Sequence, residues 1–444
     1  MMTKYGEMLL SGDAKLGIWG IGYLGYSDLA KYVAGGIKCV VSDYNPERLK
    51  RLQSEFLPSD ILLGYLGHVQ KSSNISRYIE VKETYHGLID PGILVHIISV
   101  PTQSESTPSN KWIMEALKVF IGIKDIRMSV PPLLLIESSL IPGTLDRLIL
   151  PFLKENGLVP GENVMVGICS RTDWFDENGR LFDAPRIVSA VTPDAIEIVA
   201  EIMGIIGADV IKTSDYRIAE LVKSVEKSYS QAGMTMANQL AMAFPDLDIQ
   251  EMLRLAAGRS RMPFFRPGFG SGGYDVPSAA QYVMEGANTP EYLSVFRETN
   301  YADLSMPKMI ADVVLRNKAQ RVGVLGISYK SNIKVAAMSP ALRMIGSLKG
   351  KVPLIMCYDP FYTDDEIRDI IGLDTFRFPD GLGEFDTLVI SVGHRDFKRV
   401  PWNILKEKLA DCRLVMDNMG IWKDKNWDET NVSYRQVGTP GWNK

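Results

Sequence analysis

Short apolar runs recur along the first half of the chain, and stretches with a helical spacing of apolar residues separate them. The runs are KLGIWGIGYLG (15–25), KCVVSD (38–43), ILVHIISV (93–100), PLLLIES (132–138) and NVMVGI (163–168). Apolar runs of this length between turns are typical of buried strands, and strands that alternate with helices indicate a parallel sheet. We therefore expect an α/β sheet over roughly residues 1–212.

The pattern changes after this region and later returns. Residues 215–260 contain no strand-like run, and the helix-forming stretch YRIAELVKSVEKSYSQAGMTMANQLAMAF (216–244) predicts a long helix followed by shorter ones. Further strand-like runs are RVGVLGIS (321–328), VPLIMCYD (352–359), DTLVISVG (386–393) and LVMDNMG (414–420). The predicted fold is two Rossmann-like, doubly wound α/β domains, at 1–213 and 303–444, joined by a central helical domain at 214–302.

Composition and charge narrow the class of protein. A formal net charge of −4 argues against binding to a nucleic-acid backbone. The four cysteines form no CxxC pair and the four histidines form no HxxxH pair, which argues against disulfides and a zinc site. The opening MMTKYGEMLLSGDAK lacks the apolar stretch of a signal peptide, and no apolar run reaches membrane-spanning length. We expect a cytoplasmic protein that does not associate with membranes.

A dinucleotide-binding motif lies at the end of the first strand. Gly20, Gly22 and Gly25 form GxGxxG between a strand and a helix, where glycines permit a tight turn and close approach of a pyrophosphate. Asp43 follows the next strand, where an acid accepts hydrogen bonds from the adenosine ribose and repels a 2′-phosphate. This context favours a bound NAD over NADP, and over a glycine turn without a ligand.

A second glycine-rich segment, RPGFGSGGYDVPSAA (266–280), holds four glycines in six positions. Ordering so many glycines costs backbone entropy, so something should justify them, and the run looks suited to closing over a ligand. Tyr274 and Asp275 are the first side chains after the glycines that could take part in chemistry. Asp275 could instead be a loop-capping residue.

Together these segments resemble the UDP-glucose/GDP-mannose dehydrogenase family of nucleotide-sugar 6-dehydrogenases. The matching segments, in chain order, are GIGYLG (20–25), VPT (100–102), ESSLIPGT (137–144), AELVKSVEKSYSQAGMTMANQLA (219–241), RPGFGSGGYDVPSAA (266–280), VLGISYKSNIKVAAMSP (324–340), YDP (358–360) and VGHRDF (392–397). The resemblance implies NAD in the first domain, a UDP- or GDP-linked sugar toward the second, and a homodimer formed through the central helix. It also implies oxidation of C6 from alcohol to acid in two steps, the second of which needs a cysteine thiolate to trap the aldehyde.

The resemblance also assigns individual residues. The cofactor-binding positions are Gly20, Gly22, Tyr23, Leu24, Gly25, Asp43, Arg48, Val100, Pro101, Thr102 and Ser139. The substrate-binding positions are Arg259, Phe264, Phe265, Gly270, Gly272, Gly273 and Lys330. The family's lysine on the central helix is Lys223. Arg259 resembles an arginine that reaches the partner subunit's site, and a surface arginine is its alternative; a solvated lysine is the alternative for Lys330.

The chain departs from the family at the residues of the second oxidation. Asp275 stands at the cysteine position, Ala279 at the position of the aspartate that assists water, and Lys227 at that of an asparagine. In the second lobe the DxR pair is replaced by Val335 and Ala337. The segment SRTDWFDENGR (170–180) replaces a PER-like motif, so the acidic residue expected there is not visible.

These departures predict an NAD-dependent dehydrogenase that stops after two electrons. In this hypothesis Asp275 accepts the hydroxyl proton, Lys223 holds the developing oxyanion, and Lys223 and Lys227 keep Asp275 ionised. A secondary alcohol, such as C6 of a heptose or octose nucleotide, would give a ketone and explain the lost cysteine. The alternatives are a redox-neutral epimerase, a non-catalytic nucleotide-sugar-binding protein, and a four-electron enzyme with Cys169 as a relocated nucleophile. Lys227 could also be a solvated residue, and we interpret His394 as structural.

Overall fold

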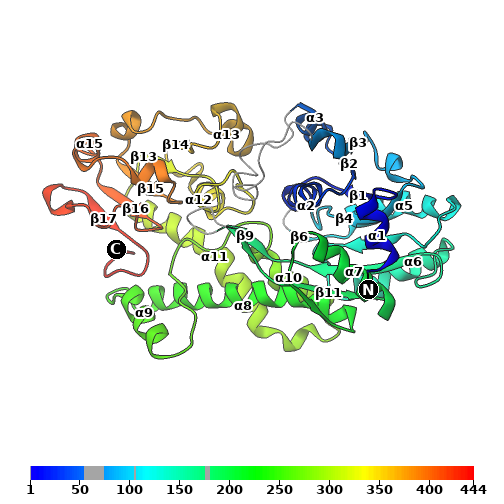
Figure 1. Cartoon of the computed structure of the whole chain (residues 1–444). Helices are drawn as coiled ribbons and strands as arrows, with labels where there is room; N and C mark the ends of the chain where they lie inside the picture. The colour runs from blue at the N-terminus through cyan, green and yellow to red at the C-terminus, as the bar shows by residue number, and fades with distance from the viewer. Residues whose placement is uncertain (1, 55–74, 105–106, 176–180) are drawn as a thin grey trace. The chain divides into compact units, whose positions relative to one another are not determined.

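The computed structural model describes residues 2–54, 75–104, 107–175 and 181–444. The chain divides into two compact units. Figure 1 shows the whole chain coloured by residue number. The first unit comprises Met1–Glu226 and Tyr282–Pro290, and the second comprises Lys227–Gln281 and Glu291–Lys444. As domain boundaries, the ranges 1–213, 214–302 and 303–444 stay a prediction.

The first unit is built on an eight-stranded sheet in the order β12-β11-β8-β7-β4-β1-β2-β3. All described pairings in this sheet are parallel except that of β11 with β8. The strands are β1 (Lys15–Trp19), β2 (Cys39–Ser42), β3 (Ile79–Val81), β4 (Ile93–Ile98), β7 (Leu133–Ile136), β8 (Met165–Ser170), β11 (Arg186–Ala190) and β12 (Val210–Lys212). The chain order reverses between β1 and β4, which is the place where Rossmann folds bind a dinucleotide.

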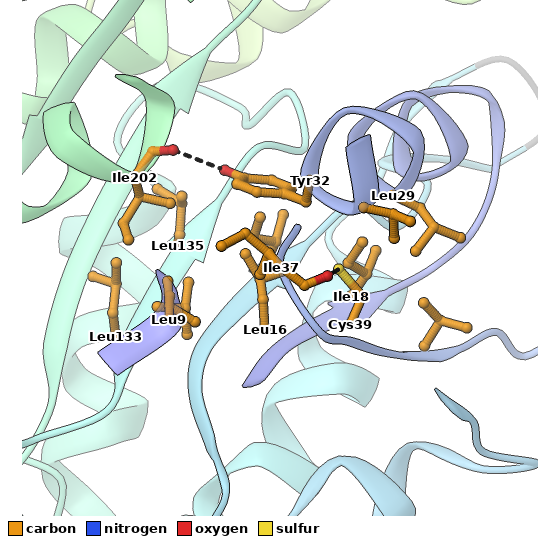
Figure 2. Packing of buried hydrophobic residues seen from close by; sticks show 14 of the residues in the cluster. Leu9, Leu16, Ile18, Leu29, Tyr32, Ile37, Cys39, Leu133, Leu135 and Ile202 are labelled. Carbon is orange, nitrogen blue, oxygen red and sulfur yellow. Dashed lines mark hydrogen bonds between the residues drawn. The ribbon is translucent and has the colours of Figure 1, made fainter. Parts of the chain in front are cut away.

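Helices cover both faces of this sheet. They are α1 (Lys4–Ser11), α2 (Tyr23–Ala34), α3 (Pro46–Ser54), α5 (Lys111–Phe120), α6 (Leu150–Glu155) and α7 (Pro193–Ile205). On β7, Leu133 and Leu135 join the buried cluster under α1, α2 and α7, and Leu134 and Ile136 join the cluster under α5. Figure 2 shows part of the first cluster, in which the hydroxyl of Tyr32 on α2 donates to the carbonyl of Ile202 on α7.

The second unit contains a five-stranded sheet, entirely parallel, in the order β14-β13-β15-β16-β17. Its strands are β13 (Arg321–Leu325), β14 (Leu354–Tyr358), β15 (Thr387–Ile390), β16 (Leu414–Asp417) and β17 (Ser433–Arg435). Its helices include α9 (Ile249–Arg259), α11 (Ser294–Arg316), α12 (Pro340–Leu348), α13 (Asp364–Ile371), α14 (Arg395–Lys398) and α15 (Trp402–Lys408). Buried clusters lie on both faces of this sheet as well.

Two helices belong to both units. The long helix predicted between the α/β regions is α8 (Tyr216–Ala243), which continues for 28 residues, and α10 (Val276–Gly286) follows the glycine-rich segment. The predicted α/β fold with two Rossmann-like sheets is confirmed. Every apolar run quoted above contains a strand or most of one, whereas β3, β11, β12 and β17 escaped prediction.

Candidate functional site

The GxGxxG turn has the backbone geometry that a pyrophosphate site requires. The N–H of Gly20 donates to the carbonyl of Ser42 at 2.8 Å, and Gly20 has a φ of +93°. A side chain on Gly25 would place its Cβ 2.0 Å from the carbonyl oxygen of Gly20, so only glycine permits this approach of helix to strand. Gly22 is the N-cap of α2, and with no side chain there the first-turn N–H groups can bind an anion.

The predicted ribose acid and its basic neighbour lie beside this turn. The Asp43 carboxylate accepts hydrogen bonds from the N–H groups of Ile21 and Asn45, each at 2.8 Å. Arg48 Nη1 lies 3.3 Å from Asp43 Oδ2 and would lie 3.7 Å from a Cβ on Gly22. The residues therefore fit the adenosine half of a dinucleotide, and their contact with a ribose stays a prediction.

The remaining predicted cofactor positions lie at the carboxyl ends of β4 and β7. Ser138 Oγ donates to the carbonyl of Val100 at 2.8 Å, and Pro101 follows Val100. Thr102 Oγ1 is 2.9 Å from the hydroxyl of Tyr282 on α10. Tyr23 and Leu24 begin α2, and the side chain of Tyr23 is outside what the structure describes.

Lys223 lies on α8 at the carboxyl edge of the first sheet. Its side chain is buried and, with Ser139 and Cys169, lines a cavity of about 10 Å³, at the lower limit for one water molecule. Glu220, one turn earlier, accepts hydrogen bonds from the N–H groups of Gly143 (2.7 Å) and Leu145 (2.8 Å). This contact fixes α8 to the segment that resembles the family's PGT motif, and burial raises the pKa of Glu220.

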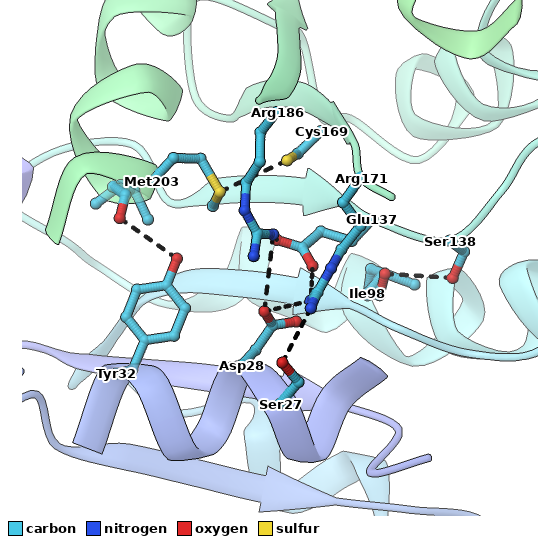
Figure 3. A network of polar contacts seen from close by, with 11 residues as sticks. Ser27, Asp28, Tyr32, Ile98, Glu137, Ser138, Cys169, Arg171, Arg186 and Met203 are labelled. Atoms are coloured by element: carbon cyan, nitrogen blue, oxygen red, sulfur yellow. Dashed lines mark hydrogen bonds and ion pairs between the residues drawn. The ribbon is translucent and has the colours of Figure 1, made fainter. Parts of the chain in front are cut away.

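Four charged side chains form a buried network at the same sheet edge (Figure 3). Arg171 Nη1 pairs with Asp28 on α2 and lies 3.1 Å from Glu137 Oε2, and its Nη2 lies 3.0 Å from Ser27 Oγ. Arg186 Nη1 lies 3.9 Å from both carboxylates. All four charged side chains are fully buried, so the network joins α2 to the ends of β7 and β8 and the start of β11.

The pKa values of the two acids in this network shift in opposite directions. Burial raises the pKa of Asp28 well above its usual value. Burial also opposes ionisation of Glu137, but Arg171 and Arg186 hold its pKa below the usual value. The sequence analysis did not predict this network. The available clue was Asp28, a charged residue among the apolar positions of a predicted helix. The segment 170–180 had been interpreted only as a lost acidic motif, and its residues 176–180 lie outside the described chain.

The glycine-rich segment lies in the second unit and is held by its backbone. Three side chains accept hydrogen bonds from its N–H groups: Asn238 from Gly268 (2.7 Å), Asn418 from Phe269 (2.9 Å) and Asp303 from Ser271 (2.8 Å). Gln231 on α8 donates to the other oxygen of Asp303 at 2.9 Å. The segment is therefore fixed from α8, α11 and the end of β16.

Packing accounts for the glycines of this segment. A Cβ on Gly272 would lie 2.6 Å from Tyr329 Cβ, and one on Gly273 would lie 2.9 Å from the Tyr329 ring. Gly270 and Gly273 also have φ values of +104° and +93°. The contacts with Tyr329 bring two predicted substrate-binding glycines, Gly272 and Gly273, to the loop that carries Lys330, whereas a Cβ on Gly270 would meet Asp303 of α11.

The other predicted residues of the second unit are more dispersed. Asp275 is exposed and directly precedes α10, the position of a helix N-cap, and Ala279 is buried one turn later. Lys227 is half-buried on α8, one turn after Lys223, which belongs to the first unit. Arg259 is exposed at the end of α9, Phe264 is exposed, and the ring of Phe265 packs on Gly233 of α8. The roles of these residues stay predictions.

The second sheet has a glycine turn like that of the first, but here a histidine contacts the acid that follows the neighbouring strand. Gly326, with a φ of +86°, donates to the carbonyl of Tyr358 at 2.7 Å, and Asp359 accepts from the N–H groups of Ile327 and Ser328. His394 Nε2 lies 3.2 Å from Asp359 Oδ2, and its Nδ1 accepts the N–H of Asn332 at 2.9 Å. Because Nδ1 accepts a hydrogen bond, Nε2 is the nitrogen that can donate to Asp359, and the interpretation of His394 as structural stays a prediction.

The cysteines offer no accessible thiol. All four are buried, and burial raises the pKa of each thiol, to about 12 for Cys412. Cys169 Sγ lies 3.5 Å from Met203 Sδ inside the first core. These surroundings suit an inert buried thiol and not a thiolate nucleophile.

The comparisons with known proteins agree with this architecture. Residues 323–424 match the model of the UDP-glucose/GDP-mannose dehydrogenase family, UDP binding domain. The chain is 22% identical to a UDP-N-acetyl-D-mannosamine dehydrogenase of Methanococcus aeolicus (96% of this chain, 95% of the other) and 25% identical to Protein CapL of Staphylococcus aureus (95% and 99%). The solved structure of a UDP-D-ManNAc dehydrogenase from Pyrococcus horikoshii superposes with a TM-score of 0.78 at 20% identity, over 96% of this chain and all of that one.

The first unit thus carries a dinucleotide-type glycine turn, and the second carries the segment that matches a UDP binding domain. Over nearly its whole length the chain is similar to nucleotide-sugar dehydrogenases, and residues 323–424 match one domain of the UDP-glucose/GDP-mannose dehydrogenase family. Among the described helices, none has both the length and the apolar character that a membrane crossing needs.

Proposed function

We propose that this protein is an NAD-dependent dehydrogenase that oxidises one alcohol of a UDP-linked sugar by two electrons. Support for the substrate class comes from the UDP-binding domain match and from relatives named as UDP-sugar dehydrogenases. Two observations together support a two-electron step. Asp275 stands where the family has its cysteine, and all four cysteines of the chain are buried.

The first unit would hold the cofactor. The turn from Gly20 to Gly25 would receive the pyrophosphate, and Asp43 with Arg48 would contact the adenosine ribose. The carbonyl of Val100 and the hydroxyl of Thr102 are held by Ser138 and Tyr282 at the side where the nicotinamide is expected. When bound, NAD supplies a hydride acceptor.

The chain's own residues would handle the proton and the oxyanion. The Asp275 carboxylate accepts the hydroxyl proton as the alcohol is oxidised, and the Lys223 ammonium stabilises the oxygen while negative charge develops on it. Lys227 adds a second positive charge one turn along α8. The step is balanced because one hydride leaves the carbinol carbon and one proton leaves its oxygen.

The second oxidation is what this chain lacks. Conversion of an aldehyde to an acid in this family needs a thiolate adduct, because a trigonal aldehyde has no hydride to release until a nucleophile adds to it. A carboxylate at position 275 is a poor nucleophile toward an aldehyde in water, and Cys169 is buried with a raised pKa. A substrate with a secondary alcohol, such as a heptose or octose at C6, would yield a ketone and need no thiol.

The test is a count of NADH formed per sugar with product mass, using NAD and a panel of UDP- and GDP-linked hexoses, N-acetylhexosamines and heptoses. We expect one NADH per UDP-sugar and a product that is two hydrogens lighter. Two NADH with a carboxylate product would overturn the two-electron proposal. A sugar epimerised without free NADH would identify a redox-neutral enzyme, and binding without any NADH across the panel would identify a non-catalytic homologue.

A matched variant distinguishes the two kinds of alcohol. Asp275→Cys combined with Ala279→Asp restores both family residues of the thiol-dependent step. With a primary alcohol, this double variant should raise the yield toward two NADH per sugar. With a secondary alcohol the ketone product cannot be oxidised to an acid, so the yield should not exceed one.

A further inference from the structure

An aromatic pair lies next to the predicted ribose site of the first unit. Tyr44 directly follows Asp43 at the end of β2, and Trp112 is the second residue of α5. Their ring centroids are 4.5 Å apart with an angle of 17° between the planes, so the two rings stack. Residues that are far apart in sequence thus meet at the carboxyl edge of the sheet.

Unlike two rings packed in a hydrophobic core, this pair is partly exposed and has cations beside it, as a binding surface would. Tyr44 is 45% exposed, whereas Trp112 is half-buried and packs against the core under α5. The guanidinium of Arg48 lies 5.8 Å from the Tyr44 ring centroid, and the ammonium of Lys111 lies 4.8 Å from the Trp112 ring centroid. An exposed ring held in place by a half-buried one, with cations beside both, suits a planar ligand that carries phosphates.

The position of the pair relative to the ribose site identifies that ligand. Asp43 and Arg48 are joined at 3.3 Å, and Tyr44 is connected to Asp43 by one peptide bond. In a dinucleotide, the adenine is attached to the ribose carbon next to the one that carries the 2′-hydroxyl. A ribose bound by Asp43 therefore delivers its base to the immediate surroundings of that acid, where Tyr44 and Trp112 lie.

We propose that the Tyr44–Trp112 pair is the surface on which the adenine ring of the dinucleotide stacks, so that these two residues set much of the cofactor affinity. This inference rests on the proposed use of NAD. Flat rings need about 3.5 Å between planes, and a separation of 4.5 Å leaves no room for a base between the two side chains. The adenine therefore lies against an outer face of the pair, and Tyr44 is the more exposed of the two rings.

The experiment measures binding of ADP-ribose and of nicotinamide mononucleotide to the full chain by calorimetry. ADP-ribose contains the adenine, and nicotinamide mononucleotide does not. We expect Tyr44→Ala and Trp112→Ala each to weaken ADP-ribose binding about tenfold or more and to leave nicotinamide mononucleotide binding unchanged. Tyr44→Phe and Trp112→Phe keep an aromatic face and should remain close to the wild type.

Controls keep the result interpretable. Tyr292→Ala removes a tyrosine of the second unit that is 81% exposed and should change neither affinity. Circular dichroism and thermal midpoints establish that each variant is folded, and quenching of tryptophan fluorescence by ADP-ribose should be smaller in Trp112→Phe than in the wild type. In turnover, Tyr44→Ala should raise KM for NAD with little change in kcat.

The outcomes separate this inference from the proposed function. Equal ADP-ribose affinity in the wild type, Tyr44→Ala and Trp112→Ala would overturn the adenine-stacking role while leaving the dehydrogenase proposal intact. Equal losses for ADP-ribose and nicotinamide mononucleotide would also overturn it, because they would indicate a general structural effect. A wild type that binds neither NAD nor ADP-ribose would overturn the proposed function itself.

Discussion

Two roles are open to Asp275: a general base in the proposed oxidation, or a structural cap of a helix. Substitutions at this residue can distinguish them. It directly precedes α10 and is exposed, so it occupies the position of a helix N-cap as well as the family's cysteine position. Asparagine caps a helix about as well as aspartate does, but it cannot accept a proton as a base. Replacement by asparagine therefore removes one role and keeps the other.

We predict that Asp275→Asn lowers kcat by about 100-fold or more and leaves KM for the UDP-sugar within a few-fold of the wild type. Its thermal midpoint should not change. Asp275→Ala should show the same kinetic loss together with about 1 kcal/mol of destabilisation from the lost cap. Steady-state kinetics and urea unfolding measure the two effects. Full activity in Asp275→Asn, with destabilisation confined to Asp275→Ala, would reduce Asp275 to a cap.

At the residue level, motifs carried more information than charges. The glycine turn and Asp43 could be predicted because each needs a particular residue type at one backbone position. Arg171 and Asp28 could not, since a charged residue in sequence is usually solvated, and only the fold brings these two side chains together. For the same reason, packing against Tyr329 was not foreseen as the cause of the glycines near Asp275.

At the level of elements, apolar periodicity predicted the central strands well and the edges poorly. Strands such as β4 and β7 are buried on both faces, so their sequences are continuous apolar runs. The edge strands β3, β12 and β17 consist of half-buried and exposed residues, and no apolar run marks them. The long helix α8 was predicted because it has no strand-like run or proline, but its contacts through Glu220 depend on the tertiary fold.

The buried network should contribute strongly to the joining of α2 with β7 and β8. We predict that Arg171→Met alone lowers the free energy of unfolding by about 3–5 kcal/mol, because it leaves the buried acids short of a partner. Adding Asp28→Leu should recover most of that loss, because the uncompensated acid is then also removed and Glu137 keeps Arg186 as a neighbour. Urea unfolding of the three proteins measures both effects.

Arg217→Met is the matched control for this prediction. Arg217 pairs with Asp215 at 2.7 Å, but its side chain is 65% exposed, so its loss should destabilise the protein far less than the loss of Arg171. If Arg171→Met were no more destabilising than Arg217→Met, the network would have no special structural role. A double variant less stable than Arg171→Met would argue that Asp28 has further partners in the fold.

At the scale of the whole molecule, both sheets have a glycine turn after their first strand, and the side chains around the two turns differ. Asp43 follows β2 and Asp359 follows β14, and each accepts hydrogen bonds from the backbone of the preceding glycine turn. In the second sheet, His394 contacts the acid and Asn332, so that turn is closed by the protein's own side chains. The division of labour that we propose, with NAD in the first unit and the UDP-sugar in the second, uses for the dinucleotide the turn whose acid meets no such histidine among the described residues.

The last prediction concerns association. On α8, exposed apolar side chains recur at intervals of three, four and seven residues, which places them on one face of the helix. They are Ile218 (51% exposed), Leu221 (36%), Val225 (38%), Tyr229 (73%) and Met236 (47%). We predict that the protein is a homodimer formed through this face, and that Val225→Glu combined with Tyr229→Glu converts it to a folded monomer in sedimentation experiments.

The control is Leu255→Glu, which places the same charge at an apolar residue of α9 that is 63% exposed, and it should remain a dimer. The monomeric variant should lose oxidation of the UDP-sugar because Arg259 is predicted to complete the partner subunit's site. It should still bind ADP-ribose, since the glycine turn, Asp43 and Tyr44 all lie within the first unit of a single chain. A wild-type monomer, or a double variant that stays dimeric, would contradict an interface on this face of α8.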